Sequence, residues 1–238
     1  MRNEMRGKRT LALLELINLG KQFDQGALTV RALNAVSLTV HQGEFVALVG
    51  PSGSGKTTLL NMIGALDVPS EGKILLDGVD IAQVNASELA QFRLHKLGFV
   101  FQAYNLVPVL SAKENVELVL MLQGRSRKAC SDQAETFLEL VGLKGMIDRR
   151  PSELSGGQQQ RVAVARALAS EPRLVLADEP TANLDSENAE ALLTLMHQLC
   201  KEKGVTFLFS THDPRVMARA ERIITLRDGR VESDEKKV

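Results

Sequence analysis

The chain has 238 residues, of which 44% are hydrophobic, so it can form one large α/β domain or two small ones around a buried core. Its 29 basic and 29 acidic residues balance, which argues against a bulk nucleic-acid binder, and with no Trp and one Tyr an aromatic platform for single strands is not expected. No apolar run approaches the roughly 20 residues of a membrane span, and no signal-type apolar segment follows the basic start of the chain.

Short apolar runs alternate with helical periodicity along most of the chain, which predicts a parallel sheet with a helical insertion. Strands are predicted at 13–19, 36–40, 45–49, 72–78 with its closing turn, 97–101, 174–177, 205–209 and 223–226. Helices are predicted from residue 59 and at 86–96, 159–169 and 188–200, and the stretch 111–141 is predicted to be helical throughout. We expect one domain over residues 11–233, with mobile charged ends at 1–10 and 234–238.

Residues 50–58, Gly-Pro-Ser-Gly-Ser-Gly-Lys-Thr-Thr, fit the phosphate-binding pattern G-x-x-x-x-G-K-[ST] between a predicted strand and a predicted helix. The alternative is an ordinary glycine- and serine-rich turn, for which a chance match with these flanks is rare. Inward backbone amides and the helix N-terminus would bind phosphate, Lys56 would reach the β- and γ-phosphates, and the Thr57 hydroxyl would bind Mg²⁺. The nucleotide ligands predicted here are Gly50, Ser52, Gly53, Gly55, Lys56, Thr57 and Thr58.

An apolar strand that ends in two acids is predicted at residues 173–179. Such a strand can place Asp178 beside the phosphate loop, where it would hold Mg²⁺ through water. Glu179 could then polarise the attacking water as a general base. Solvated acids at a strand end are the common alternative, but the phosphate loop in the same chain favours the catalytic interpretation.

A second anion-binding helix start is predicted at Leu-Ser-Gly-Gly-Gln, residues 154–158. A plain helix cap by Ser155 is the simpler interpretation. The complete string is more specific than a cap requires, so we predict two phosphate-type sites in one chain.

These motifs stand in the order found in ATP-binding-cassette ATPases, and the chain resembles that family over residues 11–233. The resemblance is carried by 50–58, Gln102, 154–158, 174–179, 183–185 and His212. The string at 154–158 is the family's own signature and separates it from other phosphate-loop NTPases. The resemblance implies an α/β fold: a RecA-like core, an N-terminal antiparallel β subdomain and a helical subdomain at about 103–170.

In this family two cassettes dimerise head to tail, with ATP between the phosphate loop of one and the signature of the other. The resemblance therefore implies that Ser155, Gly157 and Gln158 contact the nucleotide of the opposite subunit, and that Asp185 links the two sites. Gln102 would sense Mg²⁺ and the attacking water, so it counts as a metal-site residue with Thr57 and Asp178. His212 would bind the γ-phosphate and, with Glu179 and Gln102, complete the catalytic set. The cofactors implied are ATP and Mg²⁺.

Three of these residues have ordinary alternatives. Gln102 could be a polar cap after a strand, and His212 could be structural. Phe23 lies where the family usually has an aromatic, most often Tyr, that stacks on adenine, but a packing role is nearly as well supported. No role is assigned to His41, His95 or His197.

Local strings at 97–102, 105–108, 114–118, 150–153 and 177–181 look like the lipoprotein-release and macrolide-export (LolD/MacB-like) group. The resemblance implies an ATPase that powers lipoprotein release or peptide and drug export. Its partners would be an integral-membrane permease subunit (MacB- or LolC/LolE-like) and a second copy of itself, with no nucleic acid expected. It would lie at the cytoplasmic face of the inner membrane, attached through the permease. This location agrees with Cys130 and Cys200, which look like free thiols of a reducing compartment.

Two other functions remain open at this point. One is the ATPase of a solute importer, which often has an added C-terminal regulatory domain that this chain is too short to contain. The other is a non-transport cassette acting in cell-wall signalling, on DNA or on ribosomes, many of which carry two cassettes or long coiled coils. The permease contact is expected around residues 102–118, where the loop is unusually apolar because it contains Tyr104, Leu106, Val107, Pro108 and Leu110. Packing of that loop into the helical subdomain is the alternative.

Overall fold

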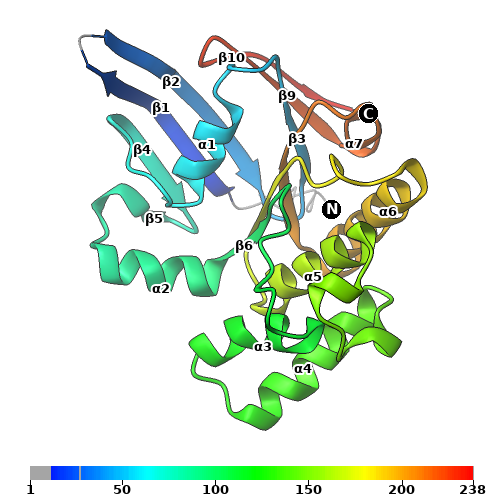
Figure 1. Ribbon diagram of the computed structural model, residues 1–238. Coiled ribbons are helices and arrows are strands. Elements are labelled where there is room, and N and C mark those ends of the chain that lie inside the picture. Colours follow the sequence, from blue (N-terminus) through cyan, green and yellow to red (C-terminus); the bar gives the residue numbers. More distant parts are fainter. Residues whose placement is uncertain (1–11, 27, 238) are drawn as a thin grey trace, which may run out of the picture.

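The computed structural model describes residues 12–26 and 28–237, which fold into two sheets and a group of helices (Figure 1). The predicted mobile start, 1–10, lies outside the described residues. The smaller sheet has the order β2-β1-β4-β5, and the larger has the order β10-β9-β3-β8-β7-β6. Within the described ranges, no helix has the length and apolar character needed to cross a bilayer.

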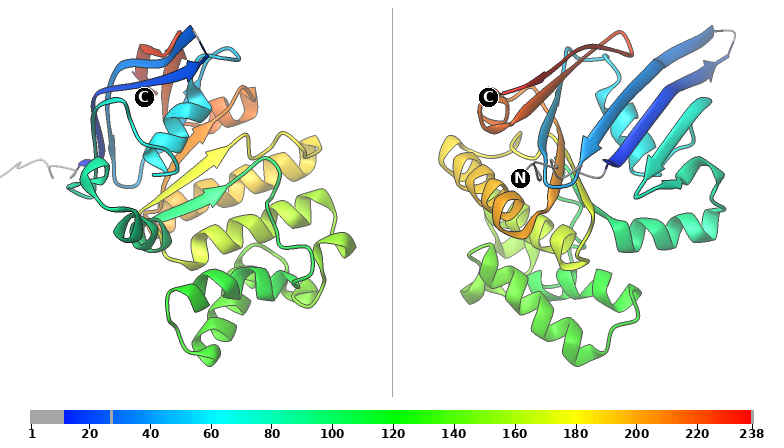
Figure 2. Two further views of the ribbon diagram at one scale, coloured as in Figure 1. Left: turned by 60° about the vertical axis from the view of Figure 1, so that its left-hand side comes forward. Right: turned by 180° about the vertical axis from the view of Figure 1, so that it is seen from behind.

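The smaller sheet is antiparallel and comes from the first third of the chain. It contains β1 (Ala12–Gln25), β2 (Leu28–His41), β4 (Glu71–Leu76) and β5 (Val79–Asp80). The strand predictions at 13–19 and 36–40 are correct in type but short, because each strand continues as an exposed hairpin arm with polar residues. Figure 2 shows this sheet standing apart from the helices at the other end of the molecule.

In the larger sheet as described, five neighbouring strands are parallel, so their carboxyl ends face the same edge, and one edge strand is antiparallel. It contains β3 (Phe45–Val49), β6 (Leu97–Val100), β7 (Leu174–Asp178), β8 (Thr206–Ser210), β9 (Arg222–Arg227) and β10 (Arg230–Lys236). Every residue of β3 and β8 is buried, as continuous apolar strands of a covered parallel sheet should be. Ligands of such sheets bind outside the carboxyl ends.

Helices cover this sheet, and three of them lie within residues 103–170, the range expected for a helical subdomain. The helices are α1 (Lys56–Ile63), α2 (Ala86–Lys96), α3 (Ala112–Leu122), α4 (Arg127–Leu140), α5 (Gly156–Ala169), α6 (Ser186–Lys203) and α7 (Pro214–Arg219). Short 3-10 turns lie at Ile81–Gln83, Lys144–Met146 and Pro151–Glu153. The helical stretch predicted at 111–141 is two helices, because Gly124 takes a φ of +79° and Ser126 caps the second.

Two apolar clusters lie on the two faces of β3. Phe45, Ala47 and Val49 face α3, α4, α5 and α6, whereas Val46 and Leu48 face α1 and the antiparallel sheet. Helix α1 is therefore packed between the two sheets, and the loop before it is held against both. Cys130 and Cys200 are free thiols, as predicted, and both are buried.

The prediction of a mobile end at 234–238 is wrong for residues 234–237. Val238 lies outside the described residues. Residues 230–236 form β10, which pairs antiparallel with β9. Arg222 donates to both carboxylate oxygens of Asp234, and Lys236 pairs with Glu44. The segment was predicted to be a tail because it is rich in charged residues, but charged residues are also typical of an edge strand. The short helix α7 was not predicted.

Candidate nucleotide and catalytic site

The predicted phosphate loop connects β3 to α1 and has a backbone that only glycine can adopt at two positions. Gly50 and Gly55 have φ values of +151° and +100°. A Cβ atom at Gly50 would lie 2.1 Å from the Leu226 carbonyl oxygen, and one at Gly55 would lie 2.6 Å from the Ala32 carbonyl oxygen. No side chain caps the start of α1, so its amides are free to meet an anion.

A cavity of about 740 Å³ opens in front of this loop, at the carboxyl edge of the large sheet. Its lining brings together residues from four separate motifs. These are Gly50, Ser52, Gly53, Gly55, Lys56, Thr57, Thr58, Gln102, Asp178, Glu179 and His212. Residues far apart in the chain therefore meet where ligands of parallel α/β sheets bind.

Lys56 folds back over the loop in this structure. Its Nζ donates to the carbonyl oxygens of Gly50 at 2.8 Å and of Pro51 at 3.0 Å. The ammonium thus lies against the carbonyl groups at the start of the phosphate loop. A bound phosphate would offer it stronger, charge-assisted acceptors.

The residues expected to hold Mg²⁺ fit that ion. Thr57 Oγ1 donates to Asp178 Oδ2 at 3.4 Å, so a hydroxyl and a carboxylate face each other at the cavity floor. Ser210, paired in register with Asp178, lines the same cavity with a buried hydroxyl that lacks a partner. Mg²⁺ prefers such oxygen donors and takes few from protein, completing its shell with phosphate and water. Among the described residues there is no cluster of three or more His, Cys, Asp or Glu suited to a metal ion.

Glu179 and His212 form a contact across the ends of β7 and β8. His212 Nδ1 lies 2.7 Å from Glu179 Oε1, and Thr211 Oγ1 donates to Glu179 Oε2 at 3.3 Å. The backbone of Glu179 has a φ of +46°, held by its N–H bond to the Ser210 carbonyl. A strained backbone that aims a carboxylate into a cavity is typical of a functional position.

Gln102 reaches the cavity from the end of β6. Its carbonyl oxygen accepts a hydrogen bond from Asn183 Nδ2 at 2.8 Å, which ties the loop after β6 to the loop after β7. Both loops therefore border the same cavity.

The residues expected to act on the opposite subunit lie outside the cavity lining. Ser155 caps α5 by accepting from the Gln158 amide, and Gln158 Oε1 accepts from the Ser155 amide in return. Gly157 lies so close to α6 that a Cβ there would be 2.8 Å from Asn188. Asp185 caps α6, and the Asn188 bonds that it accepts lower the pKa of this carboxyl. The capping interpretation of Ser155 is thus correct within one subunit.

Phe23 is not part of the cavity lining. Its ring is partly exposed on β1, with the Lys21 ammonium 4.9 Å from the ring centroid. The strand register pairs it with Val30, and the lining on this side comes from Val30, Arg31 and Ala32 of β2. Motif reasoning missed these three, because nothing in their sequence differs from an ordinary strand.

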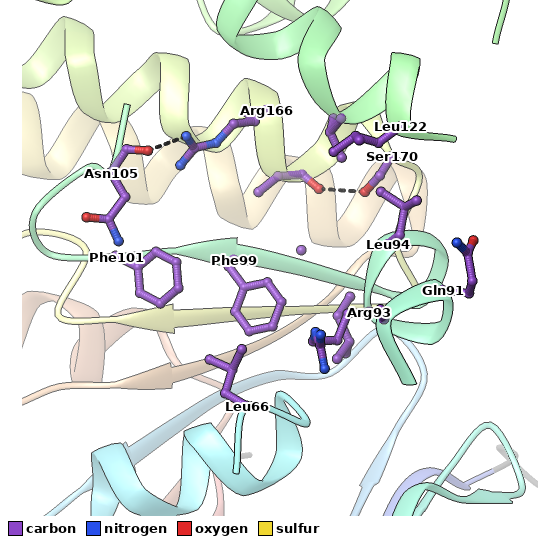
Figure 3. Close-up of a pocket in the computed structure, with 15 residues that line it drawn as sticks. Leu66, Gln91, Arg93, Leu94, Phe99, Phe101, Asn105, Leu122, Arg166 and Ser170 are labelled. Carbon is purple, nitrogen blue, oxygen red and sulfur yellow. Dashed lines mark hydrogen bonds between the residues drawn. The ribbon is translucent and has the colours of Figure 1, made fainter. Parts of the chain in front are cut away.

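A second hollow, the side groove, is lined mainly by Leu66, Leu94, Phe99, Phe101, Asn105, Leu122 and Arg166 (Figure 3). It has a volume of about 620 Å³ and lies between α2, β6, α3 and α5. Leu66 and Leu122 are 50% and 65% exposed beside it. In the loop expected to dock a partner, Leu106 packs against the apolar core and Val107 is bonded to buried Asn115, whereas Pro108 and Val109 are exposed.

Comparison with known proteins agrees with the motifs. The family model for ABC transporters matches residues 33–182. The chain is 46% identical to the lipoprotein-releasing system ATP-binding protein LolD of Shewanella oneidensis, covering 91% of this chain and 94% of LolD. It is 48% identical to the macrolide export ATP-binding/permease protein MacB of Rhodospirillum rubrum over 93% of this chain, but it spans only 34% of that longer protein.

A solved relative has the same fold. The dimeric structure of the ATP-binding cassette MJ0796 of Methanocaldococcus jannaschii, in a post-hydrolysis state bound to ADP and Pi, matches with a TM-score of 0.87 at 44% identity. The match covers 94% of this chain and 98% of that one.

Proposed function

The chain belongs to the ABC transporter family and is an ATP-binding cassette of the ATP-hydrolysing type, and from this premise we propose how its residues perform that activity. The observation that carries the proposal is the single cavity into which the phosphate loop, Gln102, Asp178, Glu179 and His212 all open. In this proposal the amides of the phosphate loop and Lys56 bind the β- and γ-phosphates. Phe23 would reach adenine only by turning toward the β2 side of the cavity.

Thr57, Asp178 and Gln102 are the residues that would hold Mg²⁺. When bound, this ion neutralises charge on the β- and γ-phosphates. Glu179 takes a proton from the attacking water, and its backbone strain keeps the carboxylate at the cavity. His212 binds the γ-phosphate and orients Glu179 through their contact.

A second copy would complete the site. Ser155, Gly157 and Gln158 stand at the start of α5, away from the chain's own cavity. A helix start attracts anions, so these residues suit the γ-phosphate held by a partner copy, with Asp185 at the contact between the two sites. The dimeric form of the MJ0796 relative supports this arrangement.

The membrane partner is proposed to be an integral-membrane permease subunit of the LolC/LolE or MacB type. The named relatives LolD and MacB support a complex for lipoprotein release or for peptide or drug export. The side groove is the surface that fits such a partner, because it is apolar, open and next to the Gln102 loop. The chain would then be peripheral, at the cytoplasmic face of the inner membrane.

A direct test is Mg²⁺-dependent ATP hydrolysis by the purified chain, with Lys56→Ala as the variant that loses the phosphate ligand. We expect hydrolysis in the unmodified chain and none above background in the variant. Equal activity in both would refute the nucleotide site. Co-purification with a permease from membranes, rather than with nucleic acid, would separate the transport function from a non-transport cassette.

A further inference from the structure

One arginine binds the loop that follows Gln102. Arg166 lies on α5, and its two terminal guanidinium nitrogens donate to consecutive carbonyl oxygens, those of Tyr104 at 2.9 Å and Asn105 at 2.5 Å. Figure 3 shows the guanidinium reaching from the helix to Asn105 at the end of the side groove. A planar fork that spans two adjacent acceptors fixes their orientation as well as their distance.

The loop at this point has an unfavourable backbone that needs external support. Tyr104 and Asn105 have φ values of +57° and +50°, a left-handed conformation that two successive non-glycine residues rarely share. Such strain persists only where the surroundings determine it. Arg166 supplies that support from a half-buried position, with both terminal nitrogens bonded to the carbonyl oxygens of the loop.

The same loop also touches the other end of α5. Gly156, the first residue of the helix, lies against the Tyr104 hydroxyl, so a Cβ atom there would be 2.9 Å from it. The loop therefore contacts α5 both at the start of the helix, next to Ser155, and near its end, at Arg166. Asn115 anchors the following residues to α3 through Val107.

We propose that Arg166 is a positioning residue that fixes the loop after Gln102 to α5, so that Gln102 moves together with the helix start carrying Ser155 and Gly157. The loop could otherwise relax out of its left-handed turn and carry Gln102 away from the cavity. Arg166 and Asn105 also line the side groove, so an occupant of that groove would press on this junction. The expected effect of Arg166 on catalysis rests on the role proposed above for Gln102. The attachment of the loop to α5 by Arg166 does not depend on that role.

The test compares Arg166→Lys with Arg161→Lys in the purified full chain. Lysine keeps the charge but lacks the fork, whereas Arg161 donates to Val141 from the same helix and is remote from the loop. We expect amide hydrogen exchange at residues 103–106 to rise roughly tenfold or more in Arg166→Lys, with α5 itself unchanged. The control variant should behave like the unmodified chain. Unchanged exchange at 103–106, or an equal rise throughout α5, would overturn the proposal.

Kinetics provide the second readout. In Arg166→Lys we expect kcat to fall about 3- to 30-fold while ATP affinity measured without Mg²⁺ stays the same. An unchanged kcat would also count against the proposal, provided that Gln102→Ala lowers kcat. If Gln102→Ala has no effect, the proposed role of Gln102 fails and hydrogen exchange alone decides the role of Arg166. Should Arg166→Lys not give a cooperative melt, Arg166→Gln is measured in the same way, because its amide can still donate to one carbonyl.

Discussion

His212 Nδ1 lies 2.7 Å from Glu179 Oε1, and this contact joins the ends of two neighbouring strands at the nucleotide cavity. The other carboxylate oxygen accepts from Thr211, so both oxygens of Glu179 are oriented by residues that follow β8. The imidazole is 79% exposed, whereas the carboxylate is 17% exposed. The acid is thus the fixed member of the pair, and the imidazole is the member free to follow a ligand.

Glu179→Gln should slow ATP hydrolysis while preserving ATP binding. An amide of the same shape can keep the contacts to His212 and Thr211 but cannot accept a proton from water. We expect turnover to fall by roughly 10²–10⁴-fold, the usual effect of losing a general base, in a steady-state phosphate-release assay. Glu187→Gln changes an exposed acid in the first turn of α6 and serves as the matched control. Near-normal turnover in Glu179→Gln would assign the base to another residue.

The parts of the site that belong to one subunit could be predicted from sequence, since motif spacing fixed the strand ends. The bounds predicted for β3 and α2 are those of the structure, because apolar strands and a capped helix leave clear signals. Local patterns could not reveal Val30–Ala32 as cavity lining, or Leu106 as packed, because both follow from how the two sheets and the helices meet. Likewise, charge alone does not distinguish an edge strand such as β10 from a tail.

Mixing two inactive variants should restore one composite site. Lys56→Ala removes the phosphate ligand of a chain's own cavity, and Ser155→Arg blocks the helix start offered to the partner. A mixed dimer then has one intact site and one doubly altered site. We expect ATP binding in the mixture, measured with a fluorescent ATP analogue, to exceed that of either variant alone.

The control for that experiment separates folding from phosphate binding. Ser155→Asp keeps an N-cap for α5 but places negative charge against the partner's γ-phosphate, so it should fold normally and behave like Ser155→Arg. The shared-site arrangement fails if the mixture binds no more ATP than the two variants separately. It also fails if ATP never shifts the monomer–dimer equilibrium in light scattering.

Removing the Ser210 hydroxyl should weaken the Mg²⁺ dependence of ATP binding. This hydroxyl is buried at the cavity beside Asp178 and has no hydrogen-bond partner among the described residues, so the coordination shell of a bound Mg²⁺ would supply one. For Ser210→Ala we expect about 3- to 10-fold more Mg²⁺ to be needed for half-maximal effect, the range of one hydrogen bond. ATP binding in EDTA should not change. A variant that melts higher but keeps its Mg²⁺ dependence would show that the hydroxyl is only an unsatisfied buried group.

Asp213 should make stability depend on acid pH. Burial acts to raise the pKa of this carboxyl, but hydrogen bonds from Arg215 and Thr181 outweigh it and lower the pKa from 3.8 to about 2. Because the folded-state pKa is depressed, the stabilisation is complete above the unfolded value of 3.8 and is lost as pH falls toward 2. At neutral pH it is on the order of 2 kcal/mol.

Urea unfolding of the unmodified chain and of Asp213→Asn, from neutral to acid pH, measures this effect. The difference in unfolding free energy should shrink as pH falls below the unfolded pKa of 3.8. Asp132→Asn, which replaces an exposed carboxylate on α4, is the control substitution. A difference that stays constant with pH would mean that shape, rather than charge, explains the cost of the substitution.

A charge placed in the side groove should uncouple the ATPase from its membrane partner. Leu122 is 65% exposed beside the groove and lies outside the nucleotide cavity, so Leu122→Asp should leave folding and basal ATPase near normal. A carboxylate there would have to be desolvated under an apolar helix, which is costly without a partner charge. We therefore expect the permease subunit to be lost from co-purification.

Val109→Asp provides the contrast, because Val109 is 69% exposed in the loop after Gln102 but does not line the groove. If Val109→Asp abolishes assembly and Leu122→Asp does not, the loop is the docking surface and the groove is not; loss in Leu122→Asp alone places the partner helix between α2 and α3.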